Sequence, residues 1–147
     1  MQKILIADDE EDLRNLLKEG LSMMGYEVIC CKNGEEAVAS LSVLGGNNIS
    51  LALIDLTMPD ISGFEVAKKI KQDAMPIKIL IMTCHLSDSD KEKGRKECGV
   101  DNYISKPFSF ACIALISMRI SKQTSHLLPR SGSFLNFLAA SNHAFGS

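Results

Sequence analysis

The sequence predicts an α/β fold in which strands and helices alternate and the strands form one parallel, doubly wound sheet. Short apolar runs typical of buried strands alternate with amphipathic stretches at helical spacing from the first residues onward. Five strands and five helices are expected in this way, without any internal repeat. Such an alternation implies right-handed crossovers and a sheet covered by helices on both faces.

The predicted strands are short and mainly apolar. They are expected at residues 3–7, 26–30, 51–55, 78–83 and around 103. Continuous apolar runs of this length are typical of strands buried on both faces of a parallel sheet. Gly25, the segment Gly45–Asn48 and the segment Pro59–Gly63 separate neighbouring elements, because glycine, asparagine and proline favour turns.

The predicted helices lie between and after the strands. They are expected at residues 10–24, 34–41, around 64–70, 87–98 and about 109–120. In the first of them, apolar residues recur at helical spacing and charged residues occupy the other face. Asp9 or Glu10 is expected to cap the first helix, since acidic residues suit a helix N-terminus. In the third helix, Phe64, Ala67 and Ile70 are expected to face the core. Gly94 and many charged residues count against the fourth helix.

Length and composition limit the classes of protein that fit this chain. With 147 residues, one domain is expected over residues 1–120, followed by a tail over residues 121–147. The formal net charge is −2 and no basic block is present, so direct nucleic-acid binding is not expected. No apolar stretch approaches the roughly 20 residues of a membrane span, so membrane insertion is not expected. The first residues do not resemble a signal peptide, and we expect a cytoplasmic protein with reduced cysteines.

Polar side chains follow four of the predicted strands at the point where each strand ends. Asp8 and Asp9 follow the first strand, and Asp55 ends the third. Thr83 ends the fourth strand, and Lys106 follows the fifth. The carboxyl ends of parallel strands meet at one edge of the sheet, where open α/β sheets bind ligands. Three carboxylates, a hydroxyl and an ammonium at this edge predict a magnesium-dependent phosphoryl-transfer site.

This ordered set of residues resembles the receiver domain of two-component response regulators. The resemblance rests on Asp8–Asp9, Asp55 with Met58–Pro59 behind it, Thr83, and Tyr103-x-x-Lys106-Pro107-Phe108, and it covers about residues 1–120. An acidic pair at a strand end is often only a helix cap, whereas the whole ordered set is specific. The resemblance implies a flavodoxin-like (βα)5 fold with sheet order 2-1-3-4-5, in which the first and third strands are neighbours.

The resemblance also implies which residues hold the metal. Clustered carboxylates repel one another unless a cation joins them, and Mg²⁺ suits a site made of oxygen ligands. By resemblance, Asp9 and Asp55 bind Mg²⁺ directly, Asp8 helps through a water molecule, and the backbone carbonyl of Thr57 completes the protein ligands. The residues alone do not separate the roles of Asp8 and Asp9.

By the same resemblance, Asp55 is the phosphoacceptor, and its carboxylate becomes an acyl phosphate. Lys106 offsets charge on the transferring oxygens and Thr83 donates a hydrogen bond to them. The Lys106–Pro107 peptide bond is expected to be cis. The implied phosphate donor is a phosphohistidine on a sensor histidine kinase or a phosphotransfer protein, and the downstream partner is a protein that the sequence does not identify.

The resemblance further implies a switch between two states. Phosphate draws the Thr83 hydroxyl toward itself and frees space into which Tyr103 rotates, which changes the surface of the fourth helix, fifth strand and fifth helix. Thr57 and His85 lie two residues after Asp55 and Thr83, at positions that modulate phosphate lifetime in the family. The alternative for His85 is a loop residue that faces solvent and has no kinetic role.

The last predicted helix departs from the family pattern. Residues 110–116 are apolar without interruption, whereas a surface helix normally has a polar face. Its outer side therefore calls for cover. A homodimer formed through the fourth helix, fifth strand and fifth helix could supply this cover. Alternatively, the apolar segment Phe134–Leu138 of the tail folds back onto the helix. The third interpretation is that the apolar run is a chance feature of the composition and needs no partner.

These residues are compatible with three classes of function, and the first is preferred to the other two. The first is a signalling receiver, which catalyses its own phosphorylation and dephosphorylation without turning over a separate substrate. The second is a stand-alone phosphotransferase or phosphatase with an aspartyl-phosphate intermediate, which would favour a further acid-base carboxylate where Thr57 stands. The third is a flavodoxin-like module for a nucleotide or flavin, which would favour a glycine-rich loop after the first strand.

Overall fold

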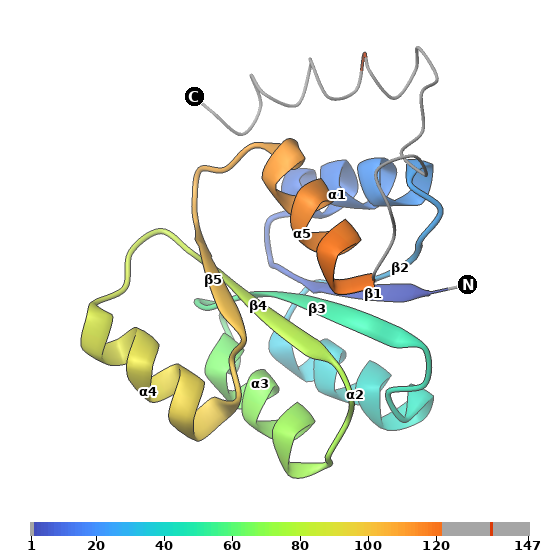
Figure 1. The fold of residues 1–147 in the computed structure, drawn as a ribbon. Helices are drawn as coiled ribbons and strands as arrows, with labels where there is room; N and C mark the ends of the chain where they lie inside the picture. The colour runs from blue at the N-terminus through green and yellow to red at the C-terminus, as the bar shows by residue number, and fades with distance from the viewer. Residues whose placement is uncertain (1, 122–135, 137–147) are drawn as a thin grey trace.

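Strands and helices alternate along the whole domain (Figure 1). The computed structural model describes residues 2–121 and residue 136. Its strands are β1 (Lys3–Ala7), β2 (Glu27–Cys31), β3 (Ile49–Asp55), β4 (Lys78–Thr83) and β5 (Asn102–Ser105). Its helices are α1 (Glu11–Met23), α2 (Gly34–Leu44), α3 (Gly63–Gln72), α4 (Asp88–Cys98) and α5 (Phe110–Ser121). The predicted alternation of elements is confirmed.

The strands form one parallel sheet in the order β2-β1-β3-β4-β5. The order reverses beside β1, where the chain passes from one side of the sheet to the other. Ala7 of β1 lies opposite Ile54 of β3, so the residues that follow them emerge next to each other at the carboxyl edge. This is the flavodoxin-like doubly wound fold with the predicted strand order.

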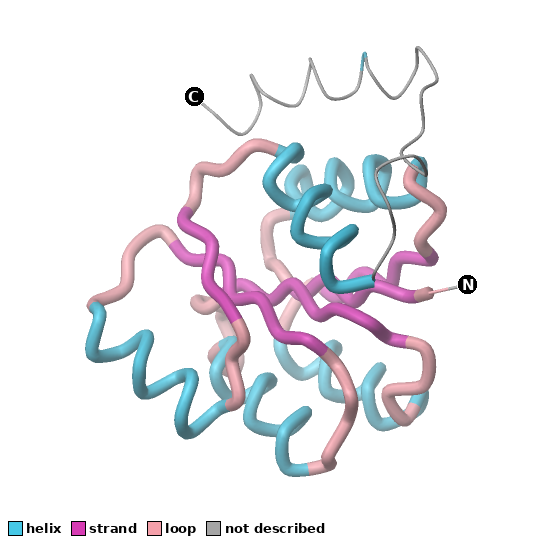
Figure 2. Tube along the Cα trace, in the orientation of Figure 1, coloured by secondary structure: helices cyan, strands magenta, loops and turns pink. Residues whose placement is uncertain are grey.

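Helices cover both faces of the sheet, α1 and α5 on one face and α2, α3 and α4 on the other (Figures 1 and 2). The alternation of side chains along β1 creates this division. Ile4 and Ile6 belong to the core beneath α1 and α5, whereas Leu5 and Ala7 belong to the core beneath the other three helices. All four side chains are fully buried. The central strands are therefore apolar on both faces, as the sequence predicts.

Some element boundaries and one helix cap differ from the prediction. The helix α2 was expected to end at Leu41, but it continues to Leu44, where Gly45 caps it in the left-handed conformation with φ of 64°. The capping prediction for the first helix is right for the position of the cap but not for its hydrogen bond. Glu10 is the N-cap residue of α1 but its side chain makes no capping hydrogen bond, and its backbone N–H donates to Oδ1 of Asp8 instead.

Phe64 packs against the core, as predicted, but it is not fully buried. Val66, Ala67 and Ile70 are the buried side chains of α3, and Phe64 is only half-buried. Its ring packs edge-on against Tyr103, with the ring centroids 6.5 Å apart. Phe64 therefore packs against the core and also contributes to the contact between α3, α4 and β5.

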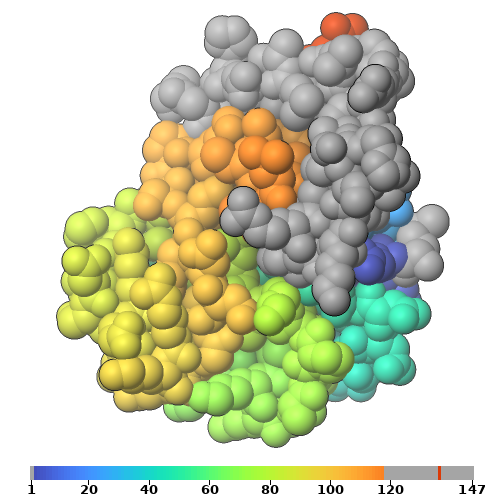
Figure 3. Space-filling model, in the orientation of Figure 1, coloured from blue at the N-terminus to red at the C-terminus, as the bar shows by residue number. Residues whose placement is uncertain are grey.

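The fourth helix forms despite Gly94 and its charges. The side chain of Ser87 accepts a hydrogen bond from the backbone of Asp90, and Gly99 ends the helix in the left-handed conformation. Only Gly94 and Cys98 are buried along α4, so few apolar contacts hold this helix on the domain. Although α4 and α5 cover opposite faces of the sheet, both are visible on the face of the molecule that the space-filling view shows (Figure 3).

The outer side of α5 carries exposed apolar side chains, as the sequence predicts. Phe110, Ile113 and Ala114 are buried, whereas Leu115 is 61% exposed. The tail and its apolar segment lie outside the described residues, apart from residue 136. Among the described residues, no helix is both long enough and apolar enough to span a bilayer.

Candidate functional site

The three carboxylates predicted to meet at the carboxyl edge of the sheet do so. Asp8, Asp9 and Asp55 each offer a carboxylate oxygen, and these oxygens all lie within 4.8 Å of one another. Asp8 is fully buried and Asp55 is 7% exposed, whereas Asp9 is exposed to solvent. The pairing of β1 with β3 produces this cluster, because residues from the first and third strands then end side by side.

Asp8 is tied down by contacts on each of its polar groups. Its Oδ2 accepts a hydrogen bond from the ammonium of Lys106 at 2.9 Å, and its Oδ1 accepts one from the Glu10 amide at 2.8 Å. Its own amide donates to the Cys31 carbonyl at 3.1 Å. Its carbonyl accepts a hydrogen bond from Nη1 of Arg14 at 2.7 Å. The contact with Arg14 has no signal in the sequence, where Arg14 reads as an ordinary polar residue of the first helix.

Asp55 lies beside Lys106 but more loosely than Asp8 does. Lys106 Nζ is 3.6 Å from its Oδ1, and the Thr57 amide donates to the same oxygen at 3.4 Å. Burial and the negative charge of Asp8 raise the pKa of Asp55 to about 6, against the smaller opposing effect of Lys106. A carboxylate that is costly to ionise without a nearby cation is expected to gain from one.

Lys106 reaches the site from the loop that follows β5. Its backbone amide donates to the Thr83 carbonyl at 2.8 Å, and its peptide bond to Pro107 is cis. Burial lowers the pKa of the Lys106 ammonium, but the hydrogen bond from Lys106 to Asp8 and the charges of Asp8 and Asp55 outweigh it, so the pKa is raised overall. Lys106 is therefore a cation held between two carboxylates.

Thr83 ends β4 at the edge of the cluster. It is 6% exposed, and its hydroxyl donates to the carbonyl of His85 at 3.2 Å. Tyr103 lies on the neighbouring strand, two register positions before the residue paired with Thr83. Since side chains alternate along a strand, Thr83 and Tyr103 occupy the same face of the sheet.

Tyr103 is held by α4 rather than left free. Its hydroxyl donates to the Lys91 carbonyl at 2.9 Å, and Arg95 lies over its ring at 5.5 Å from the centroid. A Cβ atom at Gly94 would overlap the Tyr103 hydroxyl and would lie 2.7 Å from Cε1 of Phe64. Sequence reasoning found Tyr103 but missed these partners, and it counted Gly94 only as a weakness of the helix.

Asp60 anchors the loop that follows Asp55. Its carboxylate accepts hydrogen bonds from the amides of Gly34 at 3.0 Å and Glu35 at 2.7 Å, at the start of α2. Desolvation opposes the shift, but these hydrogen bonds lower the pKa of the Asp60 carboxyl. The loop that carries Thr57 is thereby attached to a neighbouring helix. No sequence signal pointed to this contact, which joins positions 26 residues apart.

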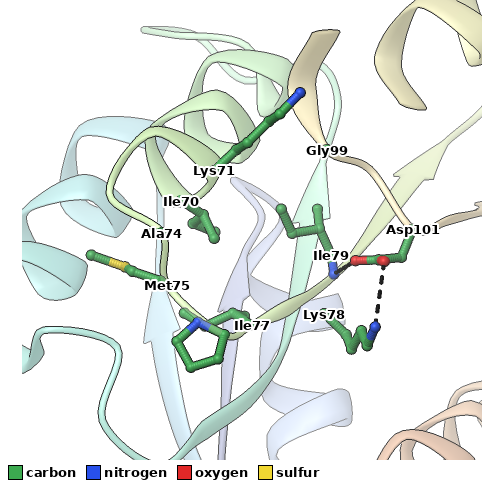
Figure 4. Close-up of a pocket in the computed structure, with 10 residues that line it drawn as sticks. Ile70, Lys71, Ala74, Met75, Ile77, Lys78, Ile79, Gly99 and Asp101 are labelled. Atoms are coloured by element: carbon green, nitrogen blue, oxygen red, sulfur yellow. Dashed lines mark hydrogen bonds and ion pairs between the residues drawn. The ribbon is translucent and has the colours of Figure 1, made fainter. Parts of the chain in front are cut away.

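A surface cavity of about 460 Å³ lies at the other end of the sheet (Figure 4). Ile70, Met75, Ile77 and Ile79 line it, and Lys78 pairs with Asp101 at its margin. Lys78 begins β4 and Asp101 precedes β5, so the cavity is at the amino edge, opposite the acidic cluster. It shares no lining residue with the acidic site and contributes nothing to its chemistry.

Known proteins with similar sequences are regulators of transcription. One is the probable transcriptional regulator ycf27 of Porphyridium aerugineum, 37% identical over 89% of this chain and 55% of its own length. Another is the alkaline phosphatase synthesis transcriptional regulatory protein PhoP of Bacillus subtilis, 37% identical over 74% of this chain and 43% of its own length. The chain thus spans about half the length of these relatives.

Similar solved structures are receiver proteins of nearly the same extent. The response regulator TrrA of Thermotoga maritima, solved in complex with Mg²⁺-BeF, is 34% identical with a TM-score of 0.67, covering 82% of this chain and 99% of its own. The chemotaxis protein CheY4 of Vibrio cholerae is 27% identical with a TM-score of 0.73, covering 82% and 98%.

The family model of the response regulator receiver domain matches residues 4–116, which include the acidic cluster, Thr83, Tyr103 and Lys106. This match agrees with the strand order and with the convergence of the cluster at the carboxyl edge of the sheet. The chain belongs to the response regulator receiver domain family of two-component signalling.

Proposed function

We propose that this chain is a phosphoacceptor receiver, in which a phosphoryl group moves from a histidine kinase phosphohistidine, or from a phosphotransfer protein, to Asp55. The observation that carries the proposal is the meeting of Asp8, Asp9 and Asp55 within 4.8 Å, with the Lys106 ammonium between Asp8 and Asp55. The groups that would serve as acceptor, as metal ligands and as a counter-charge for phosphate thus lie close together.

The donor set suits Mg²⁺. Hard divalent cations prefer oxygen ligands, and Mg²⁺ commonly takes one or two carboxylates while keeping several waters. Asp9 and Asp55 would hold the ion directly, with the Thr57 carbonyl as a third ligand. Asp8 already accepts hydrogen bonds from Lys106 and Glu10, which suits a residue that acts through water rather than directly. When bound, Mg²⁺ supplies positive charge that offsets the charge on the transferring oxygens.

Asp55 would act as the nucleophile. One of its carboxylate oxygens bonds to phosphorus while the bond from phosphorus to the donor imidazole nitrogen breaks; that nitrogen keeps the electron pair and takes up a proton from water, leaving an acyl phosphate and a neutral imidazole. Lys106, which is 3.6 Å from Asp55, lies close enough to contact the new phosphate oxygens. The Thr83 hydroxyl would leave the His85 carbonyl and donate to the phosphate. His85 stays a proposed modulator of phosphate lifetime, together with Thr57.

The signal would leave through α4, β5 and α5. Tyr103 joins β5 to α4 through its hydrogen bond with Lys91, so a movement of Thr83 that alters the space near Tyr103 also alters the surface of α4. Leu115 on α5 is exposed, and a second copy of the chain seated on this surface would bury it. The downstream partner is proposed to be a protein, not nucleic acid bound directly by this domain.

Mass measurement after incubation with a small phosphodonor tests the proposal. The wild type with Mg²⁺ should gain one phosphoryl group that hydroxylamine removes, since hydroxylamine cleaves acyl phosphates. Asp55→Asn, and the wild type in a metal chelator, should gain none. Asp73→Asn is a matched control, because it alters an exposed aspartate at the C-terminal end of α3, away from the acidic cluster, and should leave phosphorylation intact. Equal labelling of wild type and Asp55→Asn would refute the proposal.

A further inference from the structure

We propose that Arg14 is a positioning residue for the acidic cluster, whose guanidinium fixes the turn between β1 and α1 so that Asp8 and Asp9 point at the cation site. This inference rests on the proposed function of the site, because it concerns how the chain prepares its carboxylates for Mg²⁺. It assigns a role to a cation that is not a ligand and does not touch phosphate.

The inference rests on a hydrogen bond from the Arg14 side chain to the backbone of a residue earlier in the chain. Arg14 belongs to the first turns of α1, and its Nη1 donates to the carbonyl oxygen of Asp8, six residues earlier, at 2.7 Å. The Arg14 side chain is half-buried, and its charge also reaches the thiols of Cys30 and Cys31 at the end of β2. The guanidinium therefore lies between the start of α1 and the carboxyl ends of β1 and β2.

The turn needs such support because its own residues repel one another. Five consecutive acidic residues, Asp8 to Asp12, form the turn that follows β1 and the start of α1. The N-cap residue Glu10 supplies no side-chain hydrogen bond to the helix. A charged hydrogen bond from Arg14 is stronger than a neutral one and is anchored in a regular helix. It completes the set of contacts that fixes Asp8, whose amide is already held by Cys31.

Asp9 gains most from this arrangement. It is exposed, and its neighbour Asp8 supplies the fixed backbone on its N-terminal side. Groups that orient metal ligands without touching the metal typically change its affinity by about 10-fold to 100-fold when removed. Loss of Arg14 would let the turn relax away from Asp55, with Asp9 spread over several positions.

An effect of charge and an effect of positioning would change the Mg²⁺ affinity in opposite directions when Arg14 is replaced. Arg14 is a cation near a site for a cation, so its removal by charge alone should strengthen Mg²⁺ binding. If Arg14 instead holds the turn, its removal should weaken Mg²⁺ binding. Lys18 offers a matched control, because it is an exposed cation one helical turn further along α1.

The experiment is calorimetric titration with Mg²⁺ of the wild type, Arg14→Ala, Arg14→Lys and Lys18→Ala, at low and moderate salt. We expect Arg14→Ala to weaken binding about 10-fold at both salt concentrations, since a positional effect is not screened. Arg14→Lys should recover part of the affinity, because an ammonium still donates to the Asp8 carbonyl. Lys18→Ala should bind at least as tightly as the wild type.

Two results would overturn these proposals, and they are distinguishable. Arg14→Ala that binds Mg²⁺ as tightly as the wild type, or more tightly, overturns the inference while leaving the proposed function intact. A wild type that neither binds Mg²⁺ nor accepts phosphate overturns the proposed function itself. Thermal unfolding in a chelator verifies that each variant is folded, and Arg14→Gln, judged by the same criteria, replaces Arg14→Ala if the latter does not fold.

Discussion

Lys106 lies closer to Asp8 than to the proposed phosphoacceptor. Its Nζ is 2.9 Å from Oδ2 of Asp8 and 3.6 Å from Oδ1 of Asp55. Asp8 is fully buried, so its charge depends on this ammonium more than that of Asp55 does. Lys106 therefore has two roles. Its ammonium balances the charge of the buried Asp8 carboxylate, and it lies within reach of a phosphate on Asp55.

Replacing Lys106 by methionine should destabilise the metal-free protein by about 3 kcal/mol, because Asp8 would stay buried without a cation. The loss should be smaller with saturating Mg²⁺, which supplies the missing positive charge. Chemical unfolding with and without Mg²⁺ measures both values. Lys78→Met is the matched control, since Lys78 and Asp101 are 3.8 Å apart and exposed, and its cost should stay below about 1 kcal/mol. Equal losses for the two variants would contradict the assignment.

The raised pKa of Asp55 predicts how stability depends on pH. Its pKa is about 6 in the folded protein, against an ordinary value of 3.8. Folding therefore favours the protonated carboxyl, so its contribution to stability is full below about pH 4 and is lost as the pH rises through about 6. In a metal chelator, Asp55→Asn should be more stable than the wild type at pH 7 by about 2–3 kcal/mol, and the difference should vanish near pH 4.

Unfolding of both proteins across this pH range checks the prediction. Comparison with Asp55→Asn removes the contribution of the titrating groups that do not interact with Asp55, which the two proteins share. Mg²⁺ should reverse the difference at pH 7, because a bound cation favours the ionised carboxylate of the wild type. A difference between the two proteins that does not change with pH would show that the pKa of Asp55 is not raised in the folded protein.

The sheet and the acidic cluster were predictable because their signals are local in the sequence. Each strand is an apolar run, and the residue at its end falls at the carboxyl edge whatever the details of packing. This placed Asp55, Thr83 and Lys106 correctly at the carboxyl edge. The strand order was predicted from the resemblance alone, because no feature of the β1 and β3 sequences indicates that these two strands pair.

The supporting contacts were not predictable, because each depends on three-dimensional placement. Asp60 contacts α2 from a loop 26 residues away, and Arg14 turns back onto a carbonyl. Neither carries a periodicity or a motif. Gly94 was judged by helix propensity alone, and only the positions of Tyr103 and Phe64 give it a reason. The burial of Asp8 but not of Asp9 follows from the course of one turn.

Removal of the Thr83 hydroxyl should separate phosphorylation from switching. Thr83→Ala loses the hydrogen bond to the His85 carbonyl but leaves Asp55 and Lys106 unchanged, so Asp55 should still accept phosphate. The chain has two tyrosines and no tryptophan, so fluorotyrosine labelling gives one signal each for Tyr26 and Tyr103. Phosphorylation should shift the Tyr103 signal in the wild type and in Thr83→Ser, but not in Thr83→Ala.

Tyr26 serves as the internal reference in that experiment. It is buried, and its hydroxyl donates to the Ser117 carbonyl on α5, on the other face of the sheet from Tyr103. Its signal should respond little in any variant. The same shift of the Tyr103 signal in Thr83→Ala and in the wild type would mean that Tyr103 responds to phosphate without the Thr83 hydroxyl.

Gly94→Ala tests whether the Tyr103 position depends on the absence of a side chain in α4. Helix propensity alone favours alanine over glycine by about 1 kcal/mol. Here the added methyl group would overlap the Tyr103 hydroxyl and press on Phe64, so we expect a net loss of about 1–2 kcal/mol. The hydrogen bond to the Lys91 carbonyl should be lost and the Tyr103 signal should move even without phosphate.

A double substitution distinguishes this contact from a general effect on the helix. In a Tyr103→Ala background the hydroxyl is gone and Phe64 has room to move, so Gly94→Ala should become neutral or stabilising as propensity dictates. Lys93→Ala, at the preceding exposed position, should behave alike in both backgrounds. If Gly94→Ala changes stability equally with and without Tyr103, then the glycine does not create the site in which Tyr103 is held, and the coupling of β5 to α4 must come from Arg95 and Lys91 alone.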